Sequence, residues 1–430
     1  MDSNEPVGEH SQRQVYLVSN RSLSHIKARG GVNPLRLTIT KEMISSSELA
    51  GLCNINPHPE KTSFEEMEQY HDSKYLECLS WKIVPQESDR DEYNLDGEMT
   101  PTYQKLFDLN QISCGGSIAA AEEINRRKAD IAINWTGGYS AARRSRADMY
   151  CFVNDCVLAI EKLLEYNKRV LYIDTSPVLA KGVTEAFSIT DRVMVVDFVG
   201  QLNAAKDEQR PNRNGNEEAV NQTLEIPLKS GASDTTFMNM FKFVIEKVMY
   251  RFSPNVVVLQ CATTVFNGCP VNDYNLSLGG HGQAVRYLRS FHCPMVMLGG
   301  IGFDSWQAAQ CYTNATAVAL NATPVLGELL YTINKESELN IRAADIEDQN
   351  TPAYIHQLQE RLSNILHGIN AVPNVQMQPF PENVVEEWED LAQDNANPDA
   401  RLPPELMNHV IRNMGEFYDD EDGSGAHRAR

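Results

Sequence analysis

The stretch Ala132-Ile133-Asn134-Trp135-Thr136-Gly137-Gly138 has the form of a short buried strand that ends in a glycine turn. Val170-Leu171-Tyr172-Ile173-Asp174 has the same form and runs into Thr175 and Ser176. Short runs rich in valine, isoleucine and leucine, bounded by polar residues or glycine, are typical of strands buried on both faces. They predict strands over residues 130–135, 170–174, 193–198, 256–261 and 295–299.

The segments between these strands predict helices with one apolar face, over residues 156–166, 235–252, 283–291 and 307–320. The alternation indicates one α/β domain, in which a mostly parallel, multi-stranded sheet has helices on both faces. Ligand sites in such sheets lie at the carboxyl ends of the strands. We therefore expect the functional site beside Gly138, Asp174, Thr264 and Gly299.

Length and composition narrow the classes of protein that the chain can be. It has 430 residues, of which 42% are hydrophobic, enough for a substantial core. No apolar run approaches the roughly 18 to 20 residues that cross a bilayer, and the polar N-terminus has no secretory h-region. Nine cysteines without a CxxC pair favour a reducing compartment.

The net charge of −20 is unevenly distributed. Residues 382–422 hold thirteen acids against Arg401 and Arg412. This composition predicts a disordered acidic tail over 381–430, after a disordered N-terminus over 1–13 and one domain over 14–380. A chain this acidic, without a basic face apparent in its sequence, is not expected to bind nucleic acid directly.

Several runs along the chain, from Val15 to Gln378, together resemble the class I histone deacetylases. They are Glu66-Met67-Glu68-Gln69-Tyr70-His71, Cys114-Gly115-Gly116-Ser117, Phe152-Val153-Asn154-Asp155, Met297-Leu298-Gly299-Gly300 and Val372-Pro373-Asn374-Val375-Gln376. A single Gly-Gly turn would mean little, but these runs are collinear and specific. The resemblance implies the arginase/deacetylase-like form of the α/β fold.

In the family that the chain resembles, two aspartates and a histidine hold zinc, paired histidines perform acid–base work, and a tyrosine donates to the oxyanion. The resemblance places the zinc ligands on Ser176, Val178 and Thr264. It places the remaining roles, including an aspartate that grips the substrate backbone, on Ser140, Ala141, Phe303 and Met99. Valine has no donor atom and hydroxyls are weak zinc ligands. The expectation is a pseudo-deacetylase that is not an enzyme, has no catalytic residues and binds no zinc.

Other positions alter the surroundings of this site. Met149 and Ile301 stand where the family has glycines beside the acetyl-lysine path, which predicts a partly plugged tunnel. Lys181 either forms a buried ion pair with Asp174 or reaches solvent, and the sequence leaves both open. Potassium is the one ion expected, through backbone carbonyls of the matching loop at Phe187, Thr190 and Val193.

The first functional hypothesis is a scaffold, competitor or regulatory subunit in chromatin and transcriptional repression, because the core pattern is kept while site residues change together. The expected partners are corepressor or chromatin-associated proteins or an active deacetylase paralogue, with no membrane partner. Nuclear localisation, alone or with a cytoplasmic pool, follows from the resemblance. The alternative is a divergent hydrolase, or a module that binds a small ligand or ion in the remodelled pocket. Ser140 lacks a neighbouring histidine and a G-x-S-x-G turn, which weakens the hydrolase.

Overall fold

The computed structural model describes residues 13–19, 34–80, 86–95, 103–200, 223–270, 274–322 and 339–367. The chain divides into two compact units, residues 1–371 and 372–430, and every described element lies in the first. The expected acidic tail lies outside the described residues, and so does Met99. Within the described part, no helix is long and apolar enough to cross a membrane.

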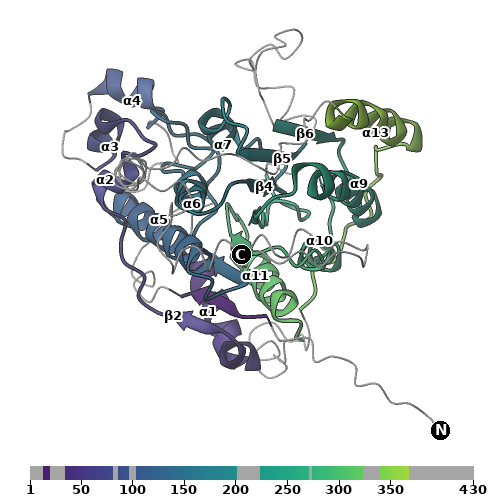
Figure 1. Ribbon diagram of the computed structural model, residues 1–430, viewed down its shortest axis with the longest axis horizontal. Helices are drawn as coiled ribbons and strands as arrows, with labels where there is room; N and C mark the ends of the chain where they lie inside the picture. Colours follow the sequence, from purple (N-terminus) through teal and green to yellow (C-terminus); the bar gives the residue numbers. More distant parts are fainter. Residues whose placement is uncertain are drawn as a thin grey trace, which may run out of the picture. The chain divides into compact units, whose positions relative to one another are not determined.

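Eight strands form one sheet in the order β2-β1-β3-β8-β7-β4-β5-β6, which lies among the helices of the first unit (Figure 1). Every neighbouring pair is parallel. This confirms the predicted α/β class. The strands are β1 (Val15–Val18), β2 (Asn54–Asn56), β3 (Ile131–Asn134), β4 (Val170–Asp174), β5 (Val193–Gly200), β6 (Thr223–Leu228), β7 (Val256–Gln260) and β8 (Met295–Leu298).

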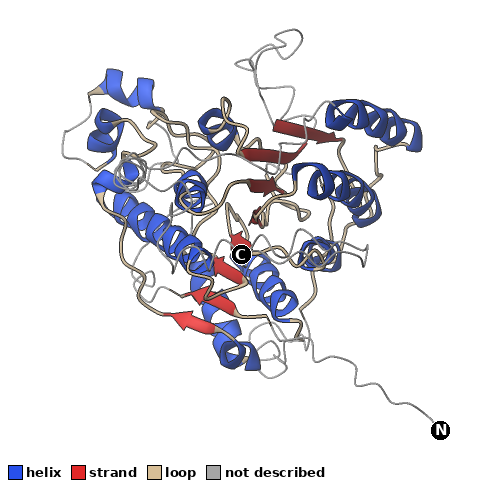
Figure 2. Cartoon of the chain, in the orientation of Figure 1, coloured by secondary structure: helices blue, strands red, loops and turns tan. Residues whose placement is uncertain are grey.

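Helices cover both faces of this sheet (Figure 2). One face packs against α3 (Ser73–Leu79), α5 (Tyr103–Asn125), α6 (Asp155–Leu164) and α7 (Lys181–Ala186). The other packs against α1 (Leu35–Ser46), α9 (Asp234–Phe252), α10 (Leu278–Arg289), α11 (Ser305–Leu320) and α13 (Pro352–His367). Shorter helices are η3 (Glu48–Leu52), α2 (Phe64–Met67) and α4 (Glu87–Tyr93).

The strands are apolar at successive positions because each face of the sheet has its own core. In β4, Leu171 and Ile173 belong to one hydrophobic cluster, while Val170 and Tyr172 belong to the other. Side chains alternate between faces with a period of two. A strand covered on both faces therefore reads as a continuous apolar run, which is the pattern that the sequence shows.

Most predicted elements match to within one or two residues, and α10 is the main exception. It begins at Leu278, ahead of the predicted start at residue 283. Ser277 caps it by accepting a hydrogen bond from the Gly280 backbone N–H at 3.1 Å. Glycine lowers helix propensity, so Gly279, Gly280 and Gly282 mask this first turn in the sequence.

The start of α9 is fixed by the carboxylate of Asp348, from a distant segment. Its Oδ2 accepts hydrogen bonds from the Ser233 backbone N–H at 3.0 Å, the Ser233 hydroxyl at 2.8 Å and the Thr236 hydroxyl at 2.6 Å. Its Oδ1 accepts from the Asn350 backbone N–H at 2.9 Å. Burial opposes ionisation, but these donors hold the pKa of Asp348 below its ordinary value.

We expect Asp348→Ala to lower the free energy of unfolding by about 2 kcal/mol, because it leaves several donors of the α9 cap without their charged acceptor. Asp345→Ala, at an exposed carboxylate nearby, is the matched control and should change stability by less than about 0.5 kcal/mol. Chemical denaturation at neutral pH measures both. Equal effects of the two substitutions would contradict the assignment.

Candidate active site

Parallel strands bring their carboxyl ends to one edge of the sheet, and the polar residues of the candidate site follow those ends. Ser140 follows β3, Asp174 ends β4 with Ser176 after it, and Thr264 follows β7. The turn after β3 needs glycine, because Gly138 has a φ of +101° and a Cβ there would lie 2.5 Å from the backbone of Gly299. The turns after β3 and β8 therefore touch directly and form the floor of the site.

Asp174 is the centre of a buried hydrogen-bond network. Its Oδ2 accepts from the Ser140 hydroxyl at 2.8 Å and from the Tyr172 hydroxyl at 2.7 Å. Its Oδ1 accepts from the Ser176 backbone N–H at 2.8 Å. Burial raises the pKa of Asp174 to about 6, although these donors oppose the shift.

The three positions expected to correspond to zinc ligands lie together. The hydroxyls of Ser176 and Thr264 are 3.2 Å apart, and the Val178 backbone N–H donates to the Ser176 hydroxyl at 3.1 Å. All three side chains are buried. The structure therefore brings these residues together, as the sequence predicts, into a small polar cluster beside Asp174.

The donors of this cluster do not fit zinc. They are two neutral hydroxyls and a valine side chain without a donor, next to one carboxylate that already accepts three hydrogen bonds. Across the described residues, no group of three or more His, Cys, Asp or Glu side chains could hold a metal ion. No catalytic step is assigned to a metal at these positions.

An apolar cluster lies next to the polar one, because Ala141 follows Ser140 in the chain and the Thr263 hydroxyl, beside Thr264, donates to the Ile301 carbonyl at 3.1 Å. Ala141 and Ile301 are buried in it, and Met149, Tyr150 and Phe303 pack against it from the surface side. The rings of Tyr150 and Phe303 meet edge to face, with centroids 5.3 Å apart. Met149 and Tyr150 both have positive φ angles, 43° and 63°, a conformation that non-glycine residues seldom adopt. Met149, Tyr150 and Phe303 are called the rim below.

Lys181 does not pair with Asp174. Its ammonium group lies 3.0 Å from the carboxylate of Asp148, and both side chains are partly exposed. The pair joins the start of α7 to the residue before Met149, so it ties the rim segment to the body of the domain. Neither sequence-based alternative named Asp148 as the partner.

Arg36 is a buried charged residue that the sequence analysis missed. Its side chain is fully buried in α1 and donates to the Tyr139 hydroxyl at 2.9 Å and to the Gly300 carbonyl at 3.2 Å. Tyr312 donates to the same carbonyl at 3.3 Å. Arg36 thereby supports both glycine turns of the floor from below. An arginine in a helix usually faces solvent, so its residue type gave no signal.

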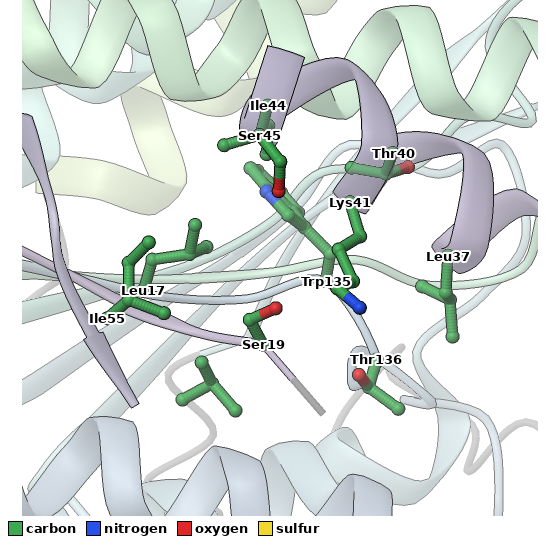
Figure 3. Close-up of a pocket in the computed structure, with 11 residues that line it drawn as sticks. Leu17, Ser19, Leu37, Thr40, Lys41, Ile44, Ser45, Ile55, Trp135 and Thr136 are labelled. Atoms are coloured by element: carbon green, nitrogen blue, oxygen red, sulfur yellow. The ribbon is translucent and has the colours of Figure 1, made fainter. Parts of the chain in front are cut away.

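A small pocket of about 40 Å³ lies between β1, β2 and α1, beside Trp135 (Figure 3). Leu17, Leu37 and Ile55 supply apolar walls, and the Lys41 side chain is also at the pocket. The Trp135 ring stacks on Tyr312 at 4.7 Å. A volume of this size has room for water rather than for a drug-sized ligand.

Among the described residues, the two buried histidines, His71 and His281, have structural partners. His71 Nε2 accepts from the Asn154 backbone N–H at 2.9 Å, and its Nδ1 lies 3.0 Å from the Arg144 carbonyl. His281 Nδ1 lies 3.5 Å from the Cys311 sulfur. Burial lowers the pKa of each imidazole to about 4. Neither ring belongs to the polar cluster around Asp174.

The expected potassium loop connects α7 to β5. Phe187 ends α7, Val193 begins β5, and the Thr190 hydroxyl accepts a hydrogen bond from the Arg192 backbone N–H at 3.2 Å. This places the three residues in one short connection. Potassium binding there stays a prediction.

Comparison with known proteins identifies the family. The histone deacetylase domain matches residues 31–319. Histone deacetylase 1 of Homo sapiens is 36% identical over 411 residues, which cover 92% of this chain and 84% of that protein. Histone deacetylase HDAC1 of Drosophila melanogaster is 33% identical over 97% of this chain and 82% of its own length. Histone deacetylase 9 of Arabidopsis thaliana is 32% identical over 92% of this chain and 94% of its own length.

These relatives correct two expectations. The expectation that the chain is not an enzyme is wrong, because relatives at 33% to 36% identity over most of the chain are named as deacetylases. The expectation of no zinc cofactor is wrong for the same reason, because the deacetylases of this family are zinc enzymes. Ser176, Val178 and Thr264 do not offer donor atoms that suit zinc, so these three positions do not identify the zinc ligands of this chain. The domain match and the extent of the identity show that the chain belongs to the histone deacetylase family.

Proposed function

We propose that this protein acts in chromatin regulation and transcriptional repression, in the nucleus, as a scaffold, competitor or regulatory subunit. Its partners would be corepressor or chromatin-associated proteins, or an active deacetylase paralogue. The names of its relatives support the chromatin setting. Partner binding can be measured independently of any deacetylase activity of the protein.

The main support for this proposal is the rim, which consists of Met149, Tyr150 and Phe303. These three residues are partly exposed, and they form an apolar surface that contains an aromatic pair. Aromatic residues that are half-buried before binding are typical anchors of protein interfaces. The buried polar residues of the site, Ser140, Asp174 and Ser176, are hydrogen-bonded to one another or to Thr264. The chemistry that the site presents to a partner is therefore apolar contact.

A second candidate, a divergent hydrolase, is favoured by the contact between Ser140 and Asp174. The hydroxyl lies 2.8 Å from a carboxylate whose pKa is raised to about 6. A carboxylate of that pKa is ionised at neutral pH, and it is a stronger base than an ordinary aspartate. Asp174 could take the proton of the Ser140 hydroxyl as that oxygen bonds to an amide carbonyl carbon, and return it to the amine nitrogen when the C–N bond breaks. Water would then hydrolyse the acyl-serine and restore the hydroxyl. This candidate uses only side chains that the structure brings together.

Affinity purification of the tagged full-length protein from its native cells, followed by mass spectrometry, tests the first candidate. We expect corepressor subunits or a deacetylase to be recovered with the native chain, and to be lost with Phe303→Ser because that change removes half of the aromatic pair. Ile365→Ser, at an exposed apolar residue on α13, is the matched control and should leave recovery unchanged. Absence of such proteins from the native sample would overturn the proposal.

Hydrolysis of an acetyl-lysine peptide by the purified protein tests the second candidate. Ser140→Ala should reduce turnover by about tenfold or more, because it removes the hydroxyl next to Asp174. Ser145→Ala, at an exposed serine in the same segment, should leave turnover intact. Turnover that survives Ser140→Ala, or a native protein with none, would exclude this hydrolase.

The raised pKa of Asp174 also predicts a pH dependence of stability. Between about pH 4 and pH 6 the folded protein keeps a proton that the unfolded chain has lost, so this group's contribution falls as the pH rises through that range. Asp174→Asn removes the titration. The free energy of unfolding of the variant minus that of the native protein should therefore be more positive at pH 7.5 than at pH 4.5. Denaturant unfolding at both values measures the difference, and a constant difference would contradict the prediction.

A further inference from the structure

The amino-terminal ends of the strands, at the side of the sheet opposite the candidate active site, differ in charge from the rest of the chain. The segments that lead into β1, β3, β4, β5, β7 and β8 are residues 13–14, 126–130, 165–169, 188–192, 250–255 and 289–294. They contain nine lysines and arginines against three acids, in a chain whose net charge is −20. These segments are called the basic edge below.

Backbone hydrogen bonds make the basic edge continuous from β3 to β5. They run from Met295 N–H to the Asp130 carbonyl at 2.9 Å, from Val257 N–H to the Pro294 carbonyl at 2.9 Å, from Asn255 N–H to the Arg169 carbonyl at 3.0 Å, and from Val170 N–H to the Arg192 carbonyl at 2.9 Å. Each bond joins the start of one strand to that of its neighbour. The cations therefore lie along one surface.

Most of the charge on this edge is not neutralised locally. Arg126 is paired with Glu122 and Glu123. Among the residues that the structure describes, no ion pair involves the ammonium groups of Lys128 and Lys168, and both side chains are exposed. Of the edge's three acids, one is paired outside the edge and one is hydrogen-bonded within it. Glu165 pairs with Lys162 at 3.0 Å, and Asp130 accepts a hydrogen bond from the Gln14 backbone N–H at 2.9 Å.

Large apolar side chains are exposed between these cations. Tyr166 is 76% exposed, Ile189 is 90% exposed and Tyr250 is 84% exposed. They belong to the segments that lead into β4 and β5 and to the end of α9 before β7, and these three strands are adjacent in the sheet. Exposed tyrosines beside unpaired cations are typical of interaction surfaces.

We propose that the basic edge binds an acidic segment of a partner protein in which apolar side chains are interspersed. The cations would pair with its carboxylates, and Tyr166, Ile189 and Tyr250 would contact its apolar side chains. Nucleic acid is the less suitable polyanion, because a long duplex would be repelled by the remaining negative charge of the chain and gains little from an exposed isoleucine. The edge lies at the opposite ends of the strands from the rim, so this inference does not rest on the role proposed for the rim.

Fluorescence anisotropy of the full-length protein with a labelled synthetic peptide of glutamate and leucine tests this proposal. We expect binding that weakens as salt is raised, and a Kd that rises at least about tenfold in the double variant Lys128→Glu/Lys168→Glu. The control Lys74→Glu/Arg361→Glu makes the same change of net charge at exposed positions away from the edge, and it should bind like the native protein. Ile189→Ser should weaken binding while Ile346→Ser, also exposed, should not.

Three results would overturn the proposal. The first is no binding of the peptide by the native protein. The second is an equal loss in both double variants, which would make the effect one of net charge. The third is tighter binding of a duplex DNA than of the peptide, which would assign the edge to nucleic acid. Circular dichroism of each variant establishes that the fold is intact before these comparisons.

Discussion

The parallel pairing of all eight strands is the constraint on which the rest of the structure depends. Parallel strands must be joined by crossovers, and the helices of those crossovers cover both faces of the sheet. The same pairing gathers residues from distant parts of the chain at one edge, so Ser140, Asp174 and Thr264 become neighbours. It also gathers the cations of the connecting segments at the opposite edge. The carboxyl ends of the strands thereby carry the candidate site and the amino-terminal ends carry the cations, within a single domain.

The central strands could be predicted from the sequence because they are buried on both faces and read as apolar runs. β1, β2 and β6 were not among the predicted strands. β2 has only three residues, largely exposed, and β6 lies at the other edge of the sheet, alternates between partly and fully buried positions and contains Pro227. In the site, family resemblance located Ser140, Ser176 and Thr264. It gave no sign of the pairing of Lys181 with Asp148, because that contact depends on the unusual turn at Met149 and Tyr150.

In the candidate site, the chemistry of individual side chains does not by itself determine the function of the whole protein. Hydroxyls at Ser176 and Thr264 limit the metal chemistry of those two positions, and this follows from the donor atoms alone. Whether the chain is an enzyme is a question about the whole molecule, and the relatives place it among enzymes. Substitutions at single positions therefore do not establish that activity or zinc is absent. The fold, in contrast, can be predicted because many positions along the chain contribute to it independently.

The contact between the turns after β3 and β8 has a consequence for how such a protein can change over time. Gly138 and Gly299 meet backbone to backbone, and Arg36 supports them from below, so the floor is built largely from main chain. Side chains above a floor of this kind can be exchanged one at a time without displacing the strands that hold them. Natural selection can thus alter what this site recognises while the sheet beneath the changing side chains keeps its main-chain contacts.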